Sequence, residues 1–269
     1  MNDTLQRLES VIAQIGPLAV AVSGGVDSMT LAVVAQKVLR GDARMLHAVS
    51  PAVPDDASSR VRDYAQRQGW RLEVIDAHEF ADPNYVANPH NRCFYCKSNL
   101  YSTMANAVDC VLVSGTNRDD LGDYRPGLQA AATHGVRHPY VEAGMDKEAV
   151  RAVARELALH DLAELPASPC LSSRVETGIA IDPKVLGAIY RAEKLIQDEL
   201  APDTARCRVR SDAIVVELDA GSLESLDVAA VDSLRSRIGA LLSAAGVERE
   251  VSFQHYRMGS AFLRPADGR

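Results

Sequence analysis

The stretch AVAVSGGVDSMTLAVV, residues 19–34, changes its hydrophobic pattern at two glycines. Before them, residues 19–22 form an apolar run without polar alternation, which predicts a buried strand. After them, apolar residues recur at helical spacing from Val26 onward. A buried strand that turns through Gly24 and Gly25 directly into a helix is typical of a parallel sheet covered by helices.

The rest of the first 165 residues repeats this alternation of strand and helix. The sequence predicts further apolar strands at 44–50, 71–76 and 109–115, and helices at 3–15, 55–69 and 145–159, with another helix around the cysteines near residue 96. Strands and helices that alternate in this way predict an α/β fold with a doubly wound, Rossmann-like parallel sheet.

Beyond residue 165 the pattern is different. A loop rich in Pro, Ser and Gly is followed by a predicted helix at 182–200, with Pro183 in its first turn. Residues 204–219 alternate with period two and predict paired strands, and a helix at 227–246 and a strand at 247–256 complete the series. We therefore predict two domains: residues 1–165, and a smaller α+β domain over residues 166–269. The family resemblance described below implies that the second domain binds substrate and forms oligomer contacts.

Composition limits the class of protein. Hydrophobic residues make up 47% of the 269 residues, enough for a substantial core, and no apolar run reaches the roughly 18 residues that a membrane helix needs. The net charge of -7 argues against a broad contact with nucleic acid. The start, MNDTLQRLES, does not resemble a signal peptide. The sequence thus predicts a cytoplasmic protein whose five cysteines serve metal binding or chemistry.

The glycine turn has the chemistry of a phosphate site. Gly24 and Gly25 let the backbone approach a ligand, and the helix that follows offers unpaired N–H groups and a positive dipole end. Ser23 and Ser28 add hydroxyl donors, and Asp27 is expected to act indirectly, through Mg²⁺. The alternative is a tight turn that binds nothing. Because the turn has no lysine, it is not the G-x-x-x-x-G-K-[ST] loop.

Five cysteines divide into two groups. Cys93 and Cys96 form a C-x-x-C pair near the start of a predicted helix, which is consistent with a redox dithiol, half of a zinc site, an iron–sulfur ligand pair or two core thiols. Cys170 lies in a second loop, SPCLSSR, so three cysteines in two loops can converge. Cys110 and Cys207 lie within predicted strands, and we expect both to be core residues.

Arginines alternate along the predicted strand RCRVR. Arg206, Arg208 and Arg210 fall on one face, with Cys207 on the other. One interpretation is a solvated face paired with acidic neighbours such as Glu217. The other is a binding site for a phosphorylated or carboxylated substrate, to which Arg174 contributes.

The S-G-G-x-D-S turn resembles the PP-loop of the ATP pyrophosphatase superfamily, whose members split ATP into AMP and pyrophosphate. The resemblance implies ATP at the carboxyl ends of the parallel strands. It also implies that the loop VSGTNRDD, residues 113–120, lines the nucleotide site with Gly115, Thr116 and Asp119; a merely polar strand end is the alternative. No glutaminase domain is visible, and the cysteines favour sulfur over ammonia as the nucleophile that is delivered.

A closer resemblance covers nearly the whole chain. The segments GTNRDDLGDYRPGLQAA, SPCLSSR and RCRVR, with A-E-K at 192–194, are similar to the LarE family of ATP-dependent sulfur transferases. This implies adenylation of a carboxylate of pyridinium-3,5-biscarboxylic acid mononucleotide, then sulfur insertion to a thiocarboxylate for the nickel-pincer nucleotide cofactor. It also implies a homo-oligomer, and substrate or phosphate contacts by Ser173, Arg174, Glu193, Arg206 and Arg208.

The cysteine pattern resembles one branch of that family. Some members sacrifice the sulfur of a single cysteine, but Pro169 stands at that position here, with Cys170 one residue later. Together with Cys93 and Cys96, this resembles the branch in which three cysteines hold a [4Fe–4S] cluster. Three thiolates leave one iron without a protein ligand, where an extra sulfide can bind. The resemblance therefore implies that these three cysteines are both catalytic and metal-binding.

Two other functions remain open at this stage. A PP-loop tRNA thiolase also uses cysteines, although the acidic net charge and the lack of a visible RNA-binding module argue against it. A zinc-stabilised nucleotide-binding module would use Cys93, Cys96 and Cys170, with His90 as a further ligand. A redox dithiol fits less well, because the C-x-x-C pair does not lie at the first βα turn.

Overall fold

A computed structural model describes residues 3–122 and 126–263 of the chain. The chain divides into two compact units. Unit 1 comprises Met1–Glu79 and Cys93–Ser168, and unit 2 comprises Phe80–Arg92 and Pro169–Arg269. Over the described ranges, no helix is both long enough and apolar enough to cross a membrane.

Unit 1 is built on a four-stranded sheet, and its strands are β1 (Leu18–Ala21), β2 (Ala43–Val49), β3 (Arg71–Asp76) and β4 (Val111–Ser114). The strands lie in the order β3-β2-β1-β4, and every neighbouring pair is parallel. The predicted parallel sheet is thus confirmed. The chain crosses from β3 back past β1 to reach β4, which is the strand order of a doubly wound sheet.

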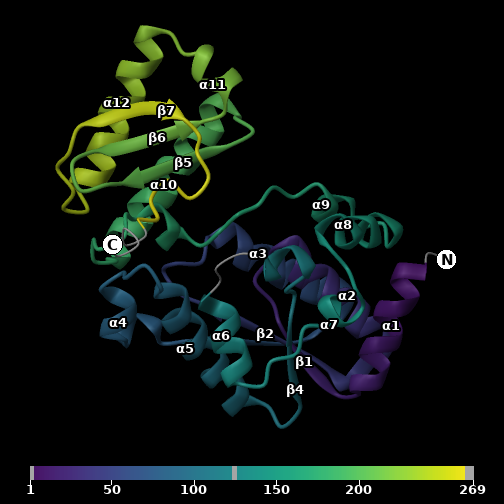
Figure 1. Cartoon of the computed structure of the whole chain (residues 1–269). Coiled ribbons are helices and arrows are strands. Elements are labelled where there is room, and N and C mark those ends of the chain that lie inside the picture. Colours follow the sequence, from purple (N-terminus) through teal and green to yellow (C-terminus); the bar gives the residue numbers. More distant parts are fainter. Residues whose placement is uncertain (1–2, 123–125, 264–269) are drawn as a thin grey trace. The chain divides into compact units, whose positions relative to one another are not determined.

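Helices cover both faces of this sheet (Figure 1). The helices of unit 1 are α1 (Asp3–Ile15), α2 (Val26–Leu39), α3 (Asp55–Gln68), α5 (Arg92–Ala107), α6 (Pro126–Thr133), α7 (Pro139–Glu142), α8 (Lys147–Glu156) and α9 (His160–Ala163). Neighbouring strand residues point to opposite cores, as strand geometry requires. Val20 belongs to the core under α1, α2 and α8, whereas Ala19 belongs to the core under α5 and α6.

Helix α2 is the central helix of unit 1. Its residues from Met29 to Ala35 are all buried, so it is enclosed on nearly every side. It packs against α1, whose Leu5, Leu8 and Ile12 are buried at helical spacing, and against α8. This burial fixes the position of the N-terminus of α2, where the glycine turn lies.

Unit 2 contains a three-stranded mixed sheet. Its strands are β5 (Ala205–Val209), β6 (Ile214–Leu218) and β7 (Val251–His255), in the order β5-β6-β7. Strands β5 and β6 form the predicted pair and are antiparallel, and β6 and β7 are parallel. The helices of unit 2 are α4 (Pro83–Val86), α10 (Pro183–Leu200), α11 (Ala220–Glu224) and α12 (Val228–Ser243), and the short 3₁₀ helix η4 spans Leu171–Arg174.

The segment Phe80–Arg92 packs with the later residues of unit 2, an association for which the sequence has no visible signal. Asn88 is fully buried, and its Nδ2 donates to the carbonyl oxygens of Glu176 and Ile179, at 2.9 Å each. Arg92 donates to Asn88 Oδ1 at 2.6 Å and stacks over the ring of Phe262 at 4.1 Å. The hydrogen bonds of Asn88 and the contacts of Arg92 thus hold this segment to the rest of unit 2.

Candidate functional site

The glycine turn after β1 has a backbone that only glycine adopts comfortably. Gly24 has φ +84°, and a Cβ there would lie 2.7 Å from the carbonyl oxygen of Ala57. The hydroxyls of Ser23 and Ser28 lie 3.0 Å apart, and Ser28 Oγ also accepts from the Ser23 N–H at 3.0 Å. The serine hydroxyls and the free N–H end of α2 thus meet in one turn.

The loop after β4 lies directly against this turn. A Cβ on Gly115 would lie 2.8 Å from the backbone nitrogen of Ser28 and 2.9 Å from the carbonyl carbon of Asp27. Such an approach between two backbones requires glycine. Asn117 caps the next short helix and donates from Nδ2 to Asp27 Oδ1 at 3.3 Å.

The predicted nucleotide residues therefore occupy neighbouring strand ends. Strand β1 ends at Ala21, which is in register with Ser114 at the end of β4. The hydroxyl of Thr116 bonds Ser114 Oγ at 3.0 Å, and Asp119 Oδ2 accepts from the backbone N–H of Lys147 at 3.1 Å. The structure brings together Ser23, Gly24, Gly25, Asp27, Ser28, Gly115, Thr116 and Asp119. Of the D-Y-R-P-G segment, residues 123–125 lie outside the described part of the chain.

Three further residues contact this site and were not predicted. Lys147 Nζ lies 2.5 Å from Asp27 Oδ2. The hydroxyl of Tyr140 donates to the backbone oxygen of Asp27 at 2.9 Å, and burial raises its pKa well above its ordinary value. Arg60 Nη1 donates to the carbonyl oxygen of Gly24 at 2.8 Å. The sequence around each of these three residues does not indicate a contact with the glycine turn, because the contacts arise from tertiary packing.

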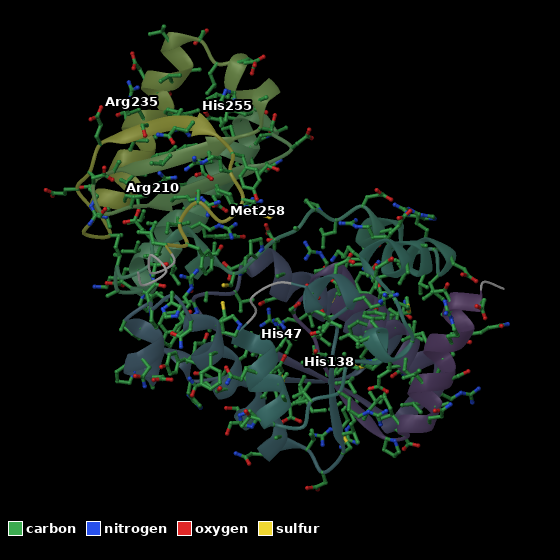
Figure 2. All side chains as sticks on the ribbon, in the orientation of Figure 1. His47, His138, Arg210, Arg235, His255 and Met258 are labelled. Atoms are coloured by element: carbon green, nitrogen blue, oxygen red, sulfur yellow. The ribbon has the colours of Figure 1, made fainter. Side chains whose placement is uncertain are left out.

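Two histidines support the same strand ends, and both are labelled in Figure 2. His47 is fully buried, with Nδ1 2.8 Å from the carbonyl oxygen of Val22 and Nε2 2.9 Å from Ser58 Oγ. His138 Nδ1 lies 2.9 Å from Ser114 Oγ. Burial lowers the pKa of both imidazoles, so both are neutral near pH 7.

We expect His47 to make the protein less stable in acid. The unfolded chain takes up a proton at this histidine near the ordinary pKa of about 6.5, whereas the folded protein resists it to lower pH. The free energy of unfolding therefore falls as the pH drops below about 6.5, by at most about 1.4 kcal/mol per pH unit for this one group. Urea unfolding of wild type and His47→Gln between pH 7.5 and 5 measures the slope, which should be smaller in the variant. His160→Gln, at an exposed position, should keep the wild-type slope; equal slopes in all three proteins would contradict the prediction.

Cys93 and Cys96 lie in the first turns of α5, as predicted, and both are half-buried. Their spacing of three residues puts them on neighbouring positions of one helix face. Cys170 is exposed and precedes η4 in unit 2. Cys207 is fully buried in β5, as predicted, and Cys110 packs at the margin of the core under α5 and α6.

No cluster of three or more His, Cys, Asp or Glu side chains suited to a metal ion occurs among the residues in the described ranges. Cys93 and Cys96 belong to unit 1 and Cys170 to unit 2, so the predicted three-cysteine site would need ligands from both units. The site therefore stays a prediction.

Arg174 holds the loop that carries Cys170. Its guanidinium makes a two-point ion pair with Glu193, at 2.9 Å for each contact. The same guanidinium donates to the carbonyl oxygen of Pro169 at 2.5 Å and to that of Cys170 at 3.2 Å. Glu193 Oε1 also accepts from the backbone N–H of Cys207, at 2.9 Å. Since the arginine and glutamate are rigidly paired, the Cys170 loop is fixed to α10 and β5.

Arg208 belongs to a buried ion network. Arg208 Nε lies 2.8 Å from Glu217 Oε2, and Arg210 lies 3.0 Å from the other carboxylate oxygen. Glu217 is 1% exposed, and it also accepts from Ser260 Oγ at 2.5 Å. The predicted pairing of the arginine row with Glu217 is thus observed for two of the three arginines. Arg206, the third, lies 6.0 Å from the ring of Tyr256.

Removal of Glu217 should be strongly destabilising. In Glu217→Ala, Arg208 would keep its charge at a site that is only 4% exposed, and a buried charge that loses its partner costs about 3–5 kcal/mol. Urea unfolding measures the loss. The matched control is Glu73→Ala, which removes the 2.7 Å pair with Arg44 on the surface of unit 1 and should cost less than about 1 kcal/mol. Equal losses in the two variants would contradict the prediction.

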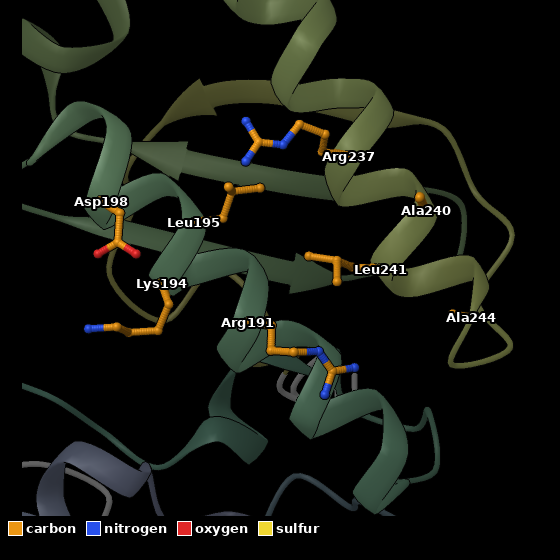
Figure 3. Close-up of a pocket in the computed structure, with 8 residues that line it drawn as sticks. All are labelled: Arg191, Lys194, Leu195, Asp198, Arg237, Ala240, Leu241 and Ala244. Atoms are coloured by element: carbon orange, nitrogen blue, oxygen red, sulfur yellow. The ribbon is translucent and has the colours of Figure 1, made fainter.

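A groove of about 570 Å³ lies elsewhere in unit 2, between α10 and α12 (Figure 3). Apart from Lys194 of the A-E-K segment, it contains none of the residues singled out from the sequence. The groove is lined by Arg191, Lys194, Leu195, Asp198, Arg237, Ala240, Leu241 and Ala244.

The parallel sheet, with polar loops packed together at the carboxyl ends of two neighbouring strands, makes unit 1 a Rossmann-like α/β core. The chain is 36% identical over 222 residues to the protein slr1717 of Synechocystis sp., covering 81% of this chain and 82% of that protein. It is 29% identical over 216 residues to pyridinium-3,5-bisthiocarboxylic acid mononucleotide synthase of Lactiplantibacillus plantarum, covering 78% of each.

A third relative is the protein MJ0830 of Methanocaldococcus jannaschii, which is 23% identical over 206 residues, covering 75% of this chain and 77% of that protein. No protein-family model matches the chain. The chain belongs to the family of the Synechocystis protein, and it is also similar to the Lactiplantibacillus synthase.

Proposed function

We propose that this chain is an ATP-dependent sulfurtransferase that forms AMP and pyrophosphate and converts a carboxylate of pyridinium-3,5-biscarboxylic acid mononucleotide into a thiocarboxylate. The observation that carries the proposal is the close packing of Gly115 against the glycine turn. This packing places the polar loops that follow two neighbouring strands, β1 and β4, side by side. The name of the Lactiplantibacillus synthase supports the choice of substrate. The thiocarboxylate formed by this chain would be used to build the nickel-pincer nucleotide cofactor.

The residues after β1 fit the phosphate chain of ATP. The N–H groups at the start of α2 point out of the helix, and phosphate oxygens are the anions that such an end favours. The hydroxyls of Ser23 and Ser28, which bond each other here, can turn toward a phosphate. The carboxylate of Asp27 suits a Mg²⁺ ion that accompanies ATP. When bound, Mg²⁺ supplies positive charge against the phosphate oxygens.

In the first chemical step, a carboxylate oxygen of the substrate attacks the α-phosphorus of ATP. The bond from this phosphorus to the bridging oxygen of the β-phosphate breaks, and pyrophosphate leaves with the electron pair. The chain's own part is to hold the phosphates at the start of α2, because fixed donors stabilise negative charge better than mobile water does. The product is an acyl-adenylate with AMP as its leaving group.

Unit 2 supplies cations for an anionic substrate. Burial, followed by the nearby charge of Arg174, lowers the pKa of Arg206. An anion beside Arg206 would relieve this repulsion, and guanidinium groups bind phosphate and carboxylate at two points. We assign this contact to Arg206, with Ser173, Arg174, Glu193 and Arg208 as its neighbours. Arg208 acts mainly through the buried network, since it already bonds Glu217 and the carbonyl oxygen of Ser173.

In the second step, sulfur at the sulfide oxidation level attacks the acyl carbon. The bond from this carbon to the AMP oxygen breaks, AMP leaves with the electron pair, and one carboxylate oxygen departs with it. No oxidant is consumed when the donor is an inorganic sulfide. The residues that would hold a [4Fe–4S] cluster are Cys93, Cys96 and Cys170; two thiols on one helix face and a third, exposed thiol suit such a ligand set. When bound, the cluster supplies an iron that can carry sulfide.

The test is a single reaction mixture with anaerobically purified protein, ATP, Mg²⁺, sulfide and the dicarboxylated nucleotide. Pyrophosphate release is expected only when both ATP and the carboxylated nucleotide are present, and mass spectrometry should show oxygen replaced by sulfur in the product. Pyrophosphate that appears without a thiocarboxylate would support the adenylation half alone. The absence of both products in the complete mixture would overturn the proposal.

A further inference from the structure

A histidine of unit 1 ends a row of three polar side chains at the carboxyl end of β4. His138 Nδ1 lies 2.9 Å from Ser114 Oγ, and Ser114 Oγ lies 3.0 Å from Thr116 Oγ1. The histidine reaches this position because Arg137 forms a single parallel bridge with Val113 and so extends the sheet beyond β4. Thr116 is one of the residues predicted to line the nucleotide site, whereas the proposed reaction gives His138 no part.

The backbone around His138 is firmly held. The N–H of Ser114 donates to the carbonyl oxygen of Arg137 at 3.0 Å. Two residues beyond the histidine, the hydroxyl of Tyr140 donates to the backbone oxygen of Asp27 at 2.9 Å. The imidazole therefore stays beside Ser114, and the part of this arrangement that can change is the placement of the protons.

The direction of the hydrogen bonds along the row depends on the histidine. A hydroxyl has one proton to donate, and Ser114 Oγ has no partner among the described residues besides His138 Nδ1 and Thr116 Oγ1. If Nδ1 carries a proton, His138 donates to Ser114, Ser114 donates to Thr116, and the Thr116 proton is free for a ligand. If Nδ1 is bare, both hydroxyls donate toward the histidine, and Thr116 can only accept from a ligand.

A nucleotide would distinguish these two states, because phosphate oxygens are strong acceptors and require donors. Burial lowers the pKa of His138, so near pH 7 the ring is neutral and has one proton for its two nitrogens. Nε2 makes no hydrogen bond to any residue in the described ranges, so no protein partner holds the proton there. The form with the proton on Nδ1 is thus available without a change in net charge.

We propose that His138 is a positioning residue for the nucleotide site, and that its Nδ1 proton orients the hydroxyls of Ser114 and Thr116 so that Thr116 presents a donor to a phosphate oxygen. The imidazole acts through Ser114 and does not itself contact the nucleotide. This inference rests on the proposed ATP dependence and adds to it the residue that sets the polarity of one donor. A replacement should be tolerated only if it keeps an N–H at the position of Nδ1.

The test compares two amide substitutions by calorimetry with α,β-methylene-ATP and Mg²⁺. The amide nitrogen of asparagine is as many bonds from Cβ as Nδ1 is, and that of glutamine as many as Nε2. His138→Asn should therefore bind almost as tightly as wild type, whereas His138→Gln should bind about three- to tenfold more weakly, the usual effect of one lost hydrogen bond. In Thr116→Val, adding His138→Gln should cause no further loss, because the hydroxyl that His138 orients is gone.

The wild-type protein offers a second test that needs no substitution at the site. Nitrogen NMR of isotope-labelled histidine should show His138 Nδ1 protonated in the complex with the nucleotide analogue. His160→Gln, at an exposed position, is the matched control and should bind like wild type. Thermal unfolding checks that each variant is folded.

Three results would overturn the role of His138 while the proposed function stands. They are a bare Nδ1 in the nucleotide complex, equal affinities of His138→Asn and His138→Gln, and an undiminished effect of His138→Gln when it is combined with Thr116→Val. If wild type itself does not bind the nucleotide analogue, both the role of His138 and the proposed function fail.

Discussion

Gly115→Ala is expected to reduce ATP-dependent pyrophosphate release by about a hundredfold or more. The new methyl group would lie 2.8 Å from the backbone nitrogen of Ser28, and backbone atoms cannot turn away as a flexible side chain can. The loop after β4 must therefore move off the start of α2, and a displacement of about 1 Å in a positioning element costs about a hundredfold in rate. The overpacking should also lower the free energy of unfolding by about 1–3 kcal/mol.

Initial rates of pyrophosphate release and urea unfolding together measure the two effects. Gly41→Ala is the control, since a Cβ at this exposed turn meets nothing within 4 Å. It should retain the wild-type rate. A normal rate in Gly115→Ala would show that the two loops do not need to touch for phosphate binding, and it would remove the observation on which the proposed function depends.

Alanine in place of Cys93, Cys96 or Cys170 should abolish thiocarboxylate formation and leave the adenylation step nearly intact. In the proposed reaction the three thiols deliver sulfur, whereas the glycine turn and the β4 loop are assigned to the nucleotide. Anaerobically purified wild type should contain iron and acid-labile sulfide and absorb broadly in the visible range. Each variant should lose this absorption, because each of the three thiolates is a ligand of the proposed cluster.

Cys110→Ala is the matched control. Burial raises the pKa of the Cys110 thiol, so it is a poor source of thiolate. The variant should keep both iron and activity. Two outcomes would contradict the prediction. One is protein that binds zinc in place of iron; the other is a colourless anaerobic protein that completes one turnover and loses the mass of one sulfur, since this would mean a sacrificed cysteine.

Much of unit 1 could be predicted from local patterns. Parallel strands buried on both faces are apolar without alternation, and this pattern located β1, β2 and β4 within two residues at each end. The edge strand β3, which has no buried residue, was also located at its observed bounds. The glycine turn was recognisable because a strand, two glycines and a helix follow one another directly. In unit 2, the alternation along RCRVR predicted a strand in this region and the burial of Cys207, which depend only on the period of a strand.

Other features could not be predicted, because they depend on which surfaces meet. The alternation along RCRVR is consistent with a solvated row of three arginines. Arg208 is instead only 4% exposed and is paired with Glu217 on the adjacent strand. Nothing in the sequence singles out Asn88 or Arg92, yet their side chains are buried in unit 2. The residues next to a side chain in the sequence do not determine whether that side chain is exposed to solvent or buried against a partner.

The candidate site combines both kinds of information. Backbone conformation and periodicity act over a few residues, so the sequence alone was sufficient to locate the glycine turn at Ser23–Ser28 and a second polar loop at Ser114–Asp120. Electrostatic partners are chosen by proximity in space, and only the packing of α8 against α2 brings Lys147 to Asp27 across 120 positions of sequence. The turn is therefore a local property of the chain, whereas the cation beside it is a property of the fold.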